Sequence, residues 1–231
     1  MRVLLFGATG MVGQGVLREC VAAQDVTEVV AIVRSPLERV QAKQTEMQHR
    51  DFFDWSDVEL DGFDACFFCL GVSSLGKNEA EYRHVTYDLT MALAEALVRA
   101  SPNAVFVYVS GAGTNAQGRQ MWARVKGATE NALMAMPFRG VYCFRPGYIQ
   151  PLHGVKSKVG WYDAMYRVVG WAEPLLMRVA PGFVTTTEAV GRAMLKVARD
   201  GWPQKVLESK DINAAAEIGR ASCRERVCML V

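Results

Sequence analysis

The chain has 231 residues, of which 51% are apolar, and its 26 lysines and arginines against 24 acidic residues give a formal net charge of +2. This apolar fraction is enough for a large core with a sheet buried on both faces. The balanced charge, with no basic run interleaved with aromatics, argues against nucleic acid as the main partner.

The first apolar run, Val3–Phe6, follows Arg2 in the manner of a secretion signal. It is too short for a signal and breaks at once into glycines, so it predicts a first strand instead. No uncharged segment reaches the length that a membrane span needs. We therefore expect a cytoplasmic protein without a membrane partner.

Short apolar runs alternate with helical patterns as far as Arg145. The expected strands are Val3–Phe6, Glu28–Val33, Thr45–Arg50, Ala65–Leu70, Ala104–Val109 and Val141–Arg145. The expected helices are Met11–Ala23, Glu79–Ala100 and Gln120–Met136. Such alternation predicts the α/β class, a Rossmann doubly wound parallel sheet of roughly six to seven strands with helices on both faces.

This alternation stops after Pro146. The expected later elements are a loop at Gly147–Lys158, short helices at Trp161–Val169 and Glu173–Val179, a helix at Thr187–Asp200 with a threonine N-cap, and a strand at Lys205–Glu208. We expect one nucleotide-binding domain over residues 1–216, with a small substrate-side extension mainly in 147–200.

The last residues, 217–231, show no apolar period. Ile218–Val227 can be translated back into DNA that matches a common sequencing adapter. We therefore expect a foreign or disordered tail from about Glu217 and exclude it from the fold prediction. A natural polar tail is the alternative.

Two cysteines, Cys66 and Cys69, form a C-x-x-C inside an expected strand. Residues three apart on a strand point to opposite faces, so these thiols are not placed to share a metal or a disulfide. We expect them to pack in the core and expect no metal site.

A glycine-rich turn, Gly7-Ala8-Thr9-Gly10-Met11-Val12-Gly13, joins the first strand to the first helix. In this context the first glycine permits a tight turn, the second lets a pyrophosphate approach the backbone, and the third lets the helix pack on the strand. Backbone N–H groups at the helix start then face the phosphate. We expect a dinucleotide to contact Gly7, Thr9, Gly10, Met11, Val12 and Gly13. An ordinary strand–turn–helix is the alternative.

Arg34 follows the second expected strand, where an NAD site usually has an acid that binds the ribose 2′-hydroxyl. A guanidinium at this position suits a 2′-phosphate. We therefore expect NADP(H) rather than NAD(H). A merely solvated Arg34 is the alternative.

Ligands of open parallel sheets bind beyond the carboxyl ends of the strands. The residues that follow the expected strands should therefore converge on one crevice. These residues are Gly7, Arg34, Gly71, Ser110 and Pro146.

Further motifs follow the glycine turn in a fixed order. They are Cys69-Leu70-Gly71, Val85-Thr86-Tyr87-Asp88, Tyr108-Val109-Ser110-Gly111, Lys126-Gly127-Ala128-Thr129-Glu130 and Arg145-Pro146-Gly147. With this set the chain resembles the atypical, epimerase/dehydratase-like short-chain dehydrogenases/reductases, most closely the NADPH-binding branch related to the Tat-interacting oxidoreductase. The resemblance implies an oxidoreductase or epimerase-like enzyme for a small carbonyl or sugar-nucleotide-like substrate. It also implies cofactor contacts from Leu70, Gly71, Lys126 and Pro146.

The resemblance further implies a catalytic serine, and a tyrosine four residues before a lysine. Ser110 and Lys126 match, but Trp122 stands in the tyrosine position. An indole N–H does not ionise usefully, so Trp122 cannot act as the general acid. Thr86 stands where many relatives carry an asparagine that relays protons.

Other side chains are candidates for the missing acid: Tyr82, Tyr87, Tyr148 and His153. Tyr148 and His153 are the best placed, because they follow Pro146, and we expect Tyr148 to complete the catalytic set with Ser110 and Lys126. Two functions stay open, an enzyme with an altered acid and a catalytically weak NADPH-binding module that reports redox state to a protein partner. A homodimer is also left open.

Overall fold

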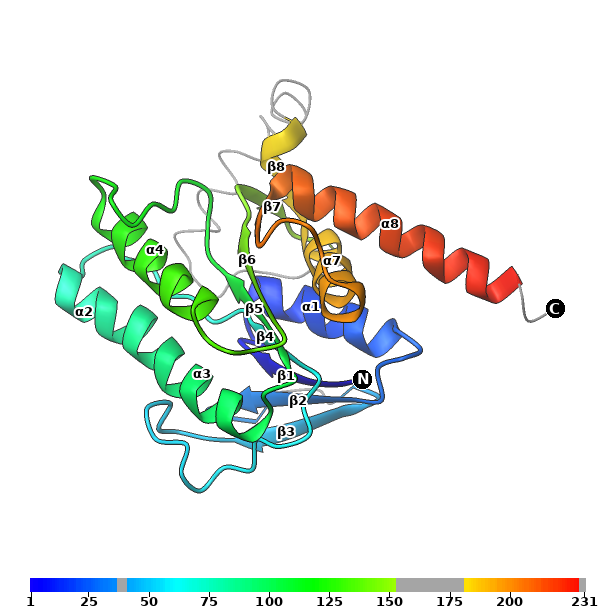
Figure 1. Cartoon of the computed structure of the whole chain (residues 1–231), viewed down its shortest axis with the longest axis horizontal. Coiled ribbons are helices and arrows are strands. Elements are labelled where there is room, and N and C mark those ends of the chain that lie inside the picture. Colours follow the sequence, from blue (N-terminus) through cyan, green and yellow to red (C-terminus); the bar gives the residue numbers. More distant parts are fainter. Residues whose placement is uncertain (37–40, 153–180, 229–231) are drawn as a thin grey trace.

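The structure, a computed structural model, describes residues 1–36, 41–152 and 181–228. A seven-stranded parallel sheet lies at its centre, in the order β3-β2-β1-β4-β5-β6-β9 (Figure 1). Its strands are β1 (Arg2–Phe6), β2 (Glu28–Val33), β3 (Gln44–Gln48), β4 (Ala65–Phe68), β5 (Val105–Val109), β6 (Gly140–Arg145) and β9 (Val206–Glu208). The predicted Rossmann fold is confirmed.

Strand β1 lies in the middle of the sheet. Its Val3 pairs with Val29 of β2 on one side and with Ala65 of β4 on the other. The chain moves outward from β1 to β3 and then returns to β4, so the strand order reverses between β1 and β4. This switch point is where open α/β sheets bind ligands.

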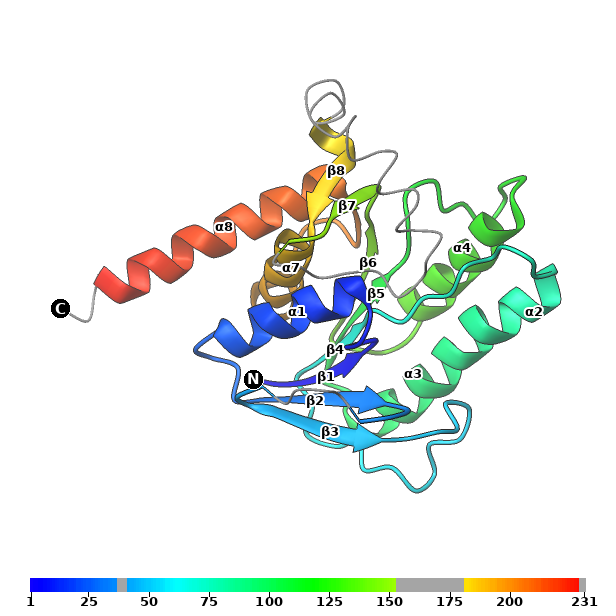
Figure 2. The same ribbon diagram turned by 180° about the vertical axis from the view of Figure 1, so that it is seen from behind.

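Helices cover both faces of the sheet (Figures 1 and 2). One face carries α2 (Glu79–Arg83), η1 (His84–Asp88), α3 (Leu89–Ala100) and α4 (Met121–Met134), and the other carries α1 (Met11–Ala22), α7 (Thr187–Asp200) and α8 (Ser209–Cys228). The predicted helix at Glu79–Ala100 is therefore present, but its middle segment is a π-helix. Such local widening is often found at functional sites.

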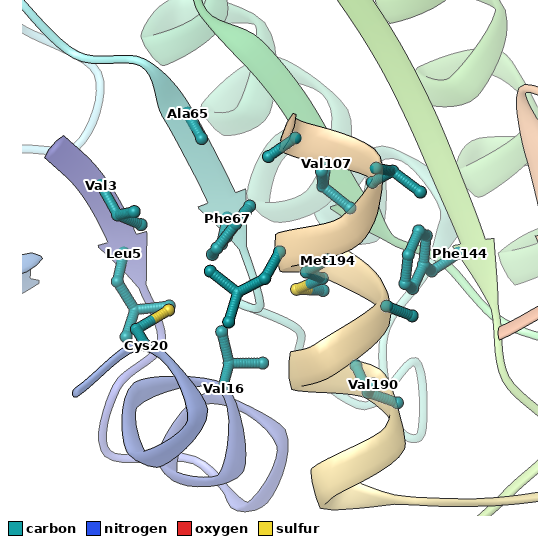
Figure 3. Close-up of a cluster of buried hydrophobic side chains, with 14 of the residues drawn as sticks. Val3, Leu5, Val16, Cys20, Ala65, Phe67, Val107, Phe144, Val190 and Met194 are labelled. Atoms are coloured by element: carbon teal, nitrogen blue, oxygen red, sulfur yellow. The ribbon is translucent and has the colours of Figure 1, made fainter. Parts of the chain in front are cut away.

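The strands alternate their apolar side chains between two buried clusters. Val3 and Leu5 of β1 pack toward α1 and α7, whereas Leu4 and Phe6 pack toward α3 and α4. Figure 3 shows the first cluster, with Met194 of α7 lying over the sheet. Cys66 and Cys69 contribute to opposite clusters, which confirms that they face away from each other.

The structure corrects the end of one predicted strand and confirms a predicted helix. Strand β4 ends at Phe68 rather than Leu70, although the backbone N–H of Cys69 still donates to the carbonyl of Phe6 at 3.1 Å. Thr187–Asp200 is confirmed as α7, and the side chain of Thr186 caps it.

A second, two-stranded sheet of β7 (Tyr148–Gln150) and β8 (Val184–Thr186) was not predicted. Its strands have three residues each, too few to show a period. The expected helices at Trp161–Val169 and Glu173–Val179 lie outside the described residues.

Helix α8 was also not predicted, and it continues across Glu217 to Cys228. Ala215 and Ala216 are buried, whereas Glu217 and Ile218 are exposed. The helix therefore packs on the core as far as Ala216, and its side chains are exposed at the expected tail boundary.

Candidate nucleotide-binding site

The glycine-rich turn passes directly against the end of β4. Gly7 has φ +78°, and a Cβ at this position would lie 2.8 Å from the carbonyl carbon of Cys69. Both the left-handed backbone and the close contact require glycine. The backbone N–H of Gly10 donates to the carbonyl of Gly7 at 2.8 Å and closes the turn.

Helix α1 packs equally closely on this turn. A Cβ at Gly13 would lie 2.0 Å from the carbonyl oxygen of Gly7, and one at Gly10 would lie 3.3 Å from the same atom. Within this described segment no side chain caps α1, and its first turn has no acidic residue. The N–H groups at the helix start are thus left for an anion, and the bare turn has the shape that a pyrophosphate needs.

The other expected cofactor residues lie along the same edge of the sheet. Arg34 is exposed and follows β2, and Leu70 and Gly71 follow β4. Pro146 follows β6, and its carbonyl accepts from the N–H of Ala112 at 3.0 Å. Because the strands are parallel, all these positions lie at their carboxyl ends, as the sequence predicted.

Lys126 of α4 contacts the loop that follows β5. Its Nζ donates to the backbone carbonyl of Ser110 at 2.7 Å. Burial lowers the pKa of Lys126 to about 8, against the opposing effect of the Glu130 carboxylate one helical turn later. Lys126 is thus a partly buried donor whose pKa is lowered to about 8.

The side chain of Ser110 is buried, and its Oγ lies 2.9 Å from the Oγ1 of Thr114. The Thr114 hydroxyl donates to the carbonyl of Gly111 at 2.7 Å. A hydroxyl has one proton to donate, so Ser110 is the donor in the Ser110–Thr114 pair. In this arrangement Ser110 holds the loop, and its proton is already used.

Glu130 links the lysine helix to β6. Its side chain is 1% exposed, and it accepts from Nε of Arg145 at 3.0 Å and from Nη2 of the same residue. The Glu130 carboxylate raises the pKa of Arg145, whose Nη1 lies 3.7 Å from Glu208 on β9. Sequence reasoning missed this network, although the spacing of Lys126 and Glu130 on one helix was visible.

Trp122 lies one turn before Lys126 and is partly buried. A Cβ at Gly113 would lie 3.6 Å from the far edge of its indole. The ring therefore packs close to the loop after β5, beside Lys126, where the family tyrosine was expected.

A small pocket opens next to Lys126, between β4, β5 and the helices α2, η1, α3 and α4. Its lining includes the apolar residues Phe68, Leu70 and Val72 and the polar residues Tyr82, Thr86, Thr90, Tyr108 and Lys126. The phenol of Tyr108 is hydrogen-bonded to the Thr129 side chain, and burial raises its pKa far above the ordinary value.

The candidates for the missing acid lie in different places. Tyr82 lines the pocket beside Lys126. Tyr148 lies on β7 in the small sheet, paired with Val184, and is not among the residues that line this pocket. The Arg83 guanidinium lies 4.0 Å above the Tyr87 ring. His153 lies outside the described residues.

Comparisons with known proteins identify the fold. No protein-family model matches the chain. Among solved structures, a short chain dehydrogenase family protein from Francisella tularensis matches with a TM-score of 0.66 and 12% identity over 93% of this chain and 98% of its own. The structure titled MoeE5 in complex with UDP-glucose and NAD matches with a TM-score of 0.59 and 19% identity, covering 90% of this chain and 75% of its own. The chain therefore shares the Rossmann fold of these structures.

Relatives that are similar in sequence carry the name FMP52. The fmp52 protein of Emericella nidulans is 30% identical over 156 residues, which cover 64% of this chain and 66% of that protein. FMP52 of Eremothecium gossypii is 29% identical over 151 residues, with the same coverage. The chain thus spans about two thirds of the length of these relatives. They do not confirm the expected branch related to the Tat-interacting oxidoreductase.

The expectation of a cytoplasmic location is corrected by the same relatives. Both are named as mitochondrial proteins, and so is FMP52 of Saccharomyces cerevisiae, which is 29% identical over 162 residues. They point to the mitochondrion. The expectation rested on the short apolar run Val3–Phe6, which carries no information about an organelle. Among the described residues, no helix is both long and apolar enough to cross a bilayer.

Proposed function

We propose that this chain binds NADP(H) on the turn Gly7–Gly13 and acts as an oxidoreductase or epimerase-like enzyme on a small carbonyl or sugar-nucleotide-like substrate. The observation that carries the proposal is the bare turn at the N-terminus of α1, where added Cβ atoms at Gly7 and Gly13 would collide with backbone. The NAD and UDP-glucose named with the MoeE5 structure, which shares this fold, support the cofactor and substrate classes.

Each expected contact has a physical reason. The first N–H groups of α1 would bind the pyrophosphate, and the exposed Arg34 would pair with a 2′-phosphate. Lys126 would donate to the nicotinamide ribose hydroxyls, and Leu70, Gly71 and Pro146 would flank the nicotinamide. When bound, the reduced cofactor supplies a hydride to the substrate.

A second function is favoured by the tryptophan that stands in the position of the family's catalytic tyrosine. Trp122 carries no usable proton, and the hydroxyl of Ser110 already donates to Thr114. These two observations favour a catalytically weak NADPH-binding module that signals to a protein partner. NADPH consumption with a panel of carbonyl compounds and nucleotide sugars distinguishes the two functions, because the module would bind NADPH without consuming it.

The cofactor preference is tested with Arg34→Asp. Titration by intrinsic fluorescence should show that the wild type binds NADPH at least about tenfold more tightly than NADH, because one ion pair with the 2′-phosphate contributes about this much. The variant should lose this preference. Arg18→Asp makes the same charge change at an exposed position late in α1 and should leave the preference intact. Equal affinities in the wild type would contradict NADP(H) selection.

A further inference from the structure

The pocket beside Lys126 contains a phenol that the expected catalytic set does not use. Tyr82 of α2 and Lys126 of α4 line the same pocket, together with Leu70 and Gly71 from the loop that follows β4. We propose that Tyr82 gives the proton to the substrate oxygen, in place of the tyrosine that Trp122 replaces. This inference rests on the proposed function, since it assumes that a nicotinamide lies at the carboxyl ends of β4 and β5.

The position of Tyr82 is held from both sides. Asn78 and Glu81 form a capping box that starts α2, and each backbone N–H to side-chain bond in it measures 3.0 Å. Arg124 of α4 donates to both carboxylate oxygens of Glu79, at 3.2 Å and 2.6 Å. The first turn of α2 is therefore tied to the helix that carries Lys126, and a fixed phenol is what proton transfer requires.

The pocket holds other hydroxyl groups. Tyr108 is a phenol as buried as Tyr82, and it donates to Thr129, because the Thr129 hydroxyl donates its own proton to the carbonyl of Val125. Thr90 donates to the carbonyl of Thr86 at 2.6 Å, and an aliphatic hydroxyl is a far weaker acid than a phenol. Tyr82 and Tyr108 are the phenols that share this pocket with Lys126, and Tyr82 is the one that lies on α2.

The geometry limits what can reach this phenol. Tyr82 is 2% exposed, and Phe68, Leu70, Val72 and Val85 form the apolar part of the wall. A carbonyl oxygen can enter such a pocket, whereas the rest of a substrate would stay outside. The dry wall also strengthens a hydrogen bond from the phenol to that oxygen.

The reaction is the reduction of a carbonyl to an alcohol, and the reduced nicotinamide supplies its two electrons. A hydride from the reduced nicotinamide forms the new C–H bond at the carbonyl carbon, and the carbonyl π electrons move to oxygen. The O–H bond of Tyr82 breaks, and its proton forms the alcohol O–H. The Lys126 ammonium returns a proton to the phenolate and is itself reprotonated from solvent. Among the described residues, Glu130 of α4 and Tyr108 of β5 are titratable groups next to this pair.

The test compares Tyr82→Phe with Tyr87→Phe in the full chain. Tyr87 is the matched control, because it lies five residues later and does not line the pocket. With the carbonyl panel, we expect Tyr82→Phe to oxidise NADPH about 10²–10⁴-fold more slowly, the usual loss of a general acid, with unchanged NADPH affinity. Adding Trp122→Tyr to Tyr82→Phe should restore part of this rate, because it returns a phenol to α4.

A second readout does not depend on turnover. Calorimetry measures the binding of the carbonyl compound to protein loaded with NADP⁺, a complex that cannot react. Loss of the phenol should weaken this binding about fivefold to tenfold in Tyr82→Phe and leave it unchanged in Tyr87→Phe.

The outcomes separate the two proposals. If the wild type is active and Tyr82→Phe loses less than about threefold in both rate and binding, the role of Tyr82 is wrong and the proposed function stands. If NADPH binds and no carbonyl is reduced, both the reaction and the role of Tyr82 are overturned in favour of the binding module. If NADPH does not bind, the proposed function itself fails.

Discussion

A Cβ added at Gly13 would lie 2.0 Å from the carbonyl oxygen of Gly7, closer than any nonbonded contact allows. The helix and the turn could then remain together only by moving backbone. We expect Gly13→Ala to destabilise the fold by about 2–3 kcal/mol or to prevent folding, as overpacked sites do. Urea unfolding measures this. Gly10→Ala, with its Cβ at 3.3 Å, should stay close to the wild type, and equal stability of Gly13→Ala would contradict the geometry.

The buried ion pair of Glu130 and Arg145 predicts a contrast with a surface pair. Glu130→Ala should cost about 3–5 kcal/mol of unfolding free energy, because Arg145 keeps a partly buried charge without its main partner. Glu79→Ala removes an exposed partner of Arg124 and should change stability little. Thermal or urea unfolding of both variants is the measurement. Similar losses in the two variants would contradict the difference in burial.

The low pKa of Lys126 predicts how cofactor binding depends on pH. The lysine loses its proton near pH 8 in the free protein, so its ammonium fraction falls as pH rises from about 7 to 9. If Lys126 donates to the cofactor ribose, NADPH affinity should fall by about fivefold over this range, the difference between a charge-assisted and a neutral hydrogen bond. Lys126→Met should bind more weakly and lose this part of the pH dependence. An identical pH profile in the variant would contradict the role.

The end of α8 predicts where truncation becomes costly. Removing 217–231 should leave the melting temperature nearly unchanged, because the side chains at Glu217 and Ile218 are exposed. Removing the chain from Ile212 should lower it by several degrees, since Ile212, Ala215 and Ala216 are buried. Differential scanning calorimetry compares the two. A drop of several degrees in the shorter truncation would show that the tail belongs to the fold.

Most of the sheet followed from local pattern. The runs at Glu28–Val33 and Thr187–Asp200 were predicted with their observed bounds, because a buried parallel strand is a continuous apolar run and an amphipathic helix repeats its apolar residues with the helical period. Strand β7 was missed because three residues show no period and its partner β8 lies more than thirty residues later. Pairing of that kind is a tertiary property.

Part of the candidate site could likewise be predicted from the sequence, and part could not. The turn Gly7–Gly13 and the strand-end residues could be placed from sequence, since parallel strands bring their carboxyl ends to one edge. The residues that line the pocket beside Lys126 could not be placed. Tyr148 was preferred as the acid because it follows Pro146, and this role stays a prediction. It lies on the small sheet, whereas Tyr82 lines the pocket because α2 packs against α4. Helix packing of this kind leaves no mark in sequence spacing.

The most direct test of dinucleotide binding is a fluorescence titration of the full chain with NADPH, for the wild type and Gly10→Ala. Gly182→Ala is the control, because it adds the same methyl group outside the turn, where the new Cβ meets only an ordinary contact at 3.8 Å. We predict saturable binding in the wild type and the control, and at least about tenfold weaker binding in Gly10→Ala with its melting temperature preserved, since the methyl group occupies the approach of the pyrophosphate. A wild type that does not bind NADPH, or a Gly10→Ala variant with unchanged affinity, would contradict a cofactor site on this turn.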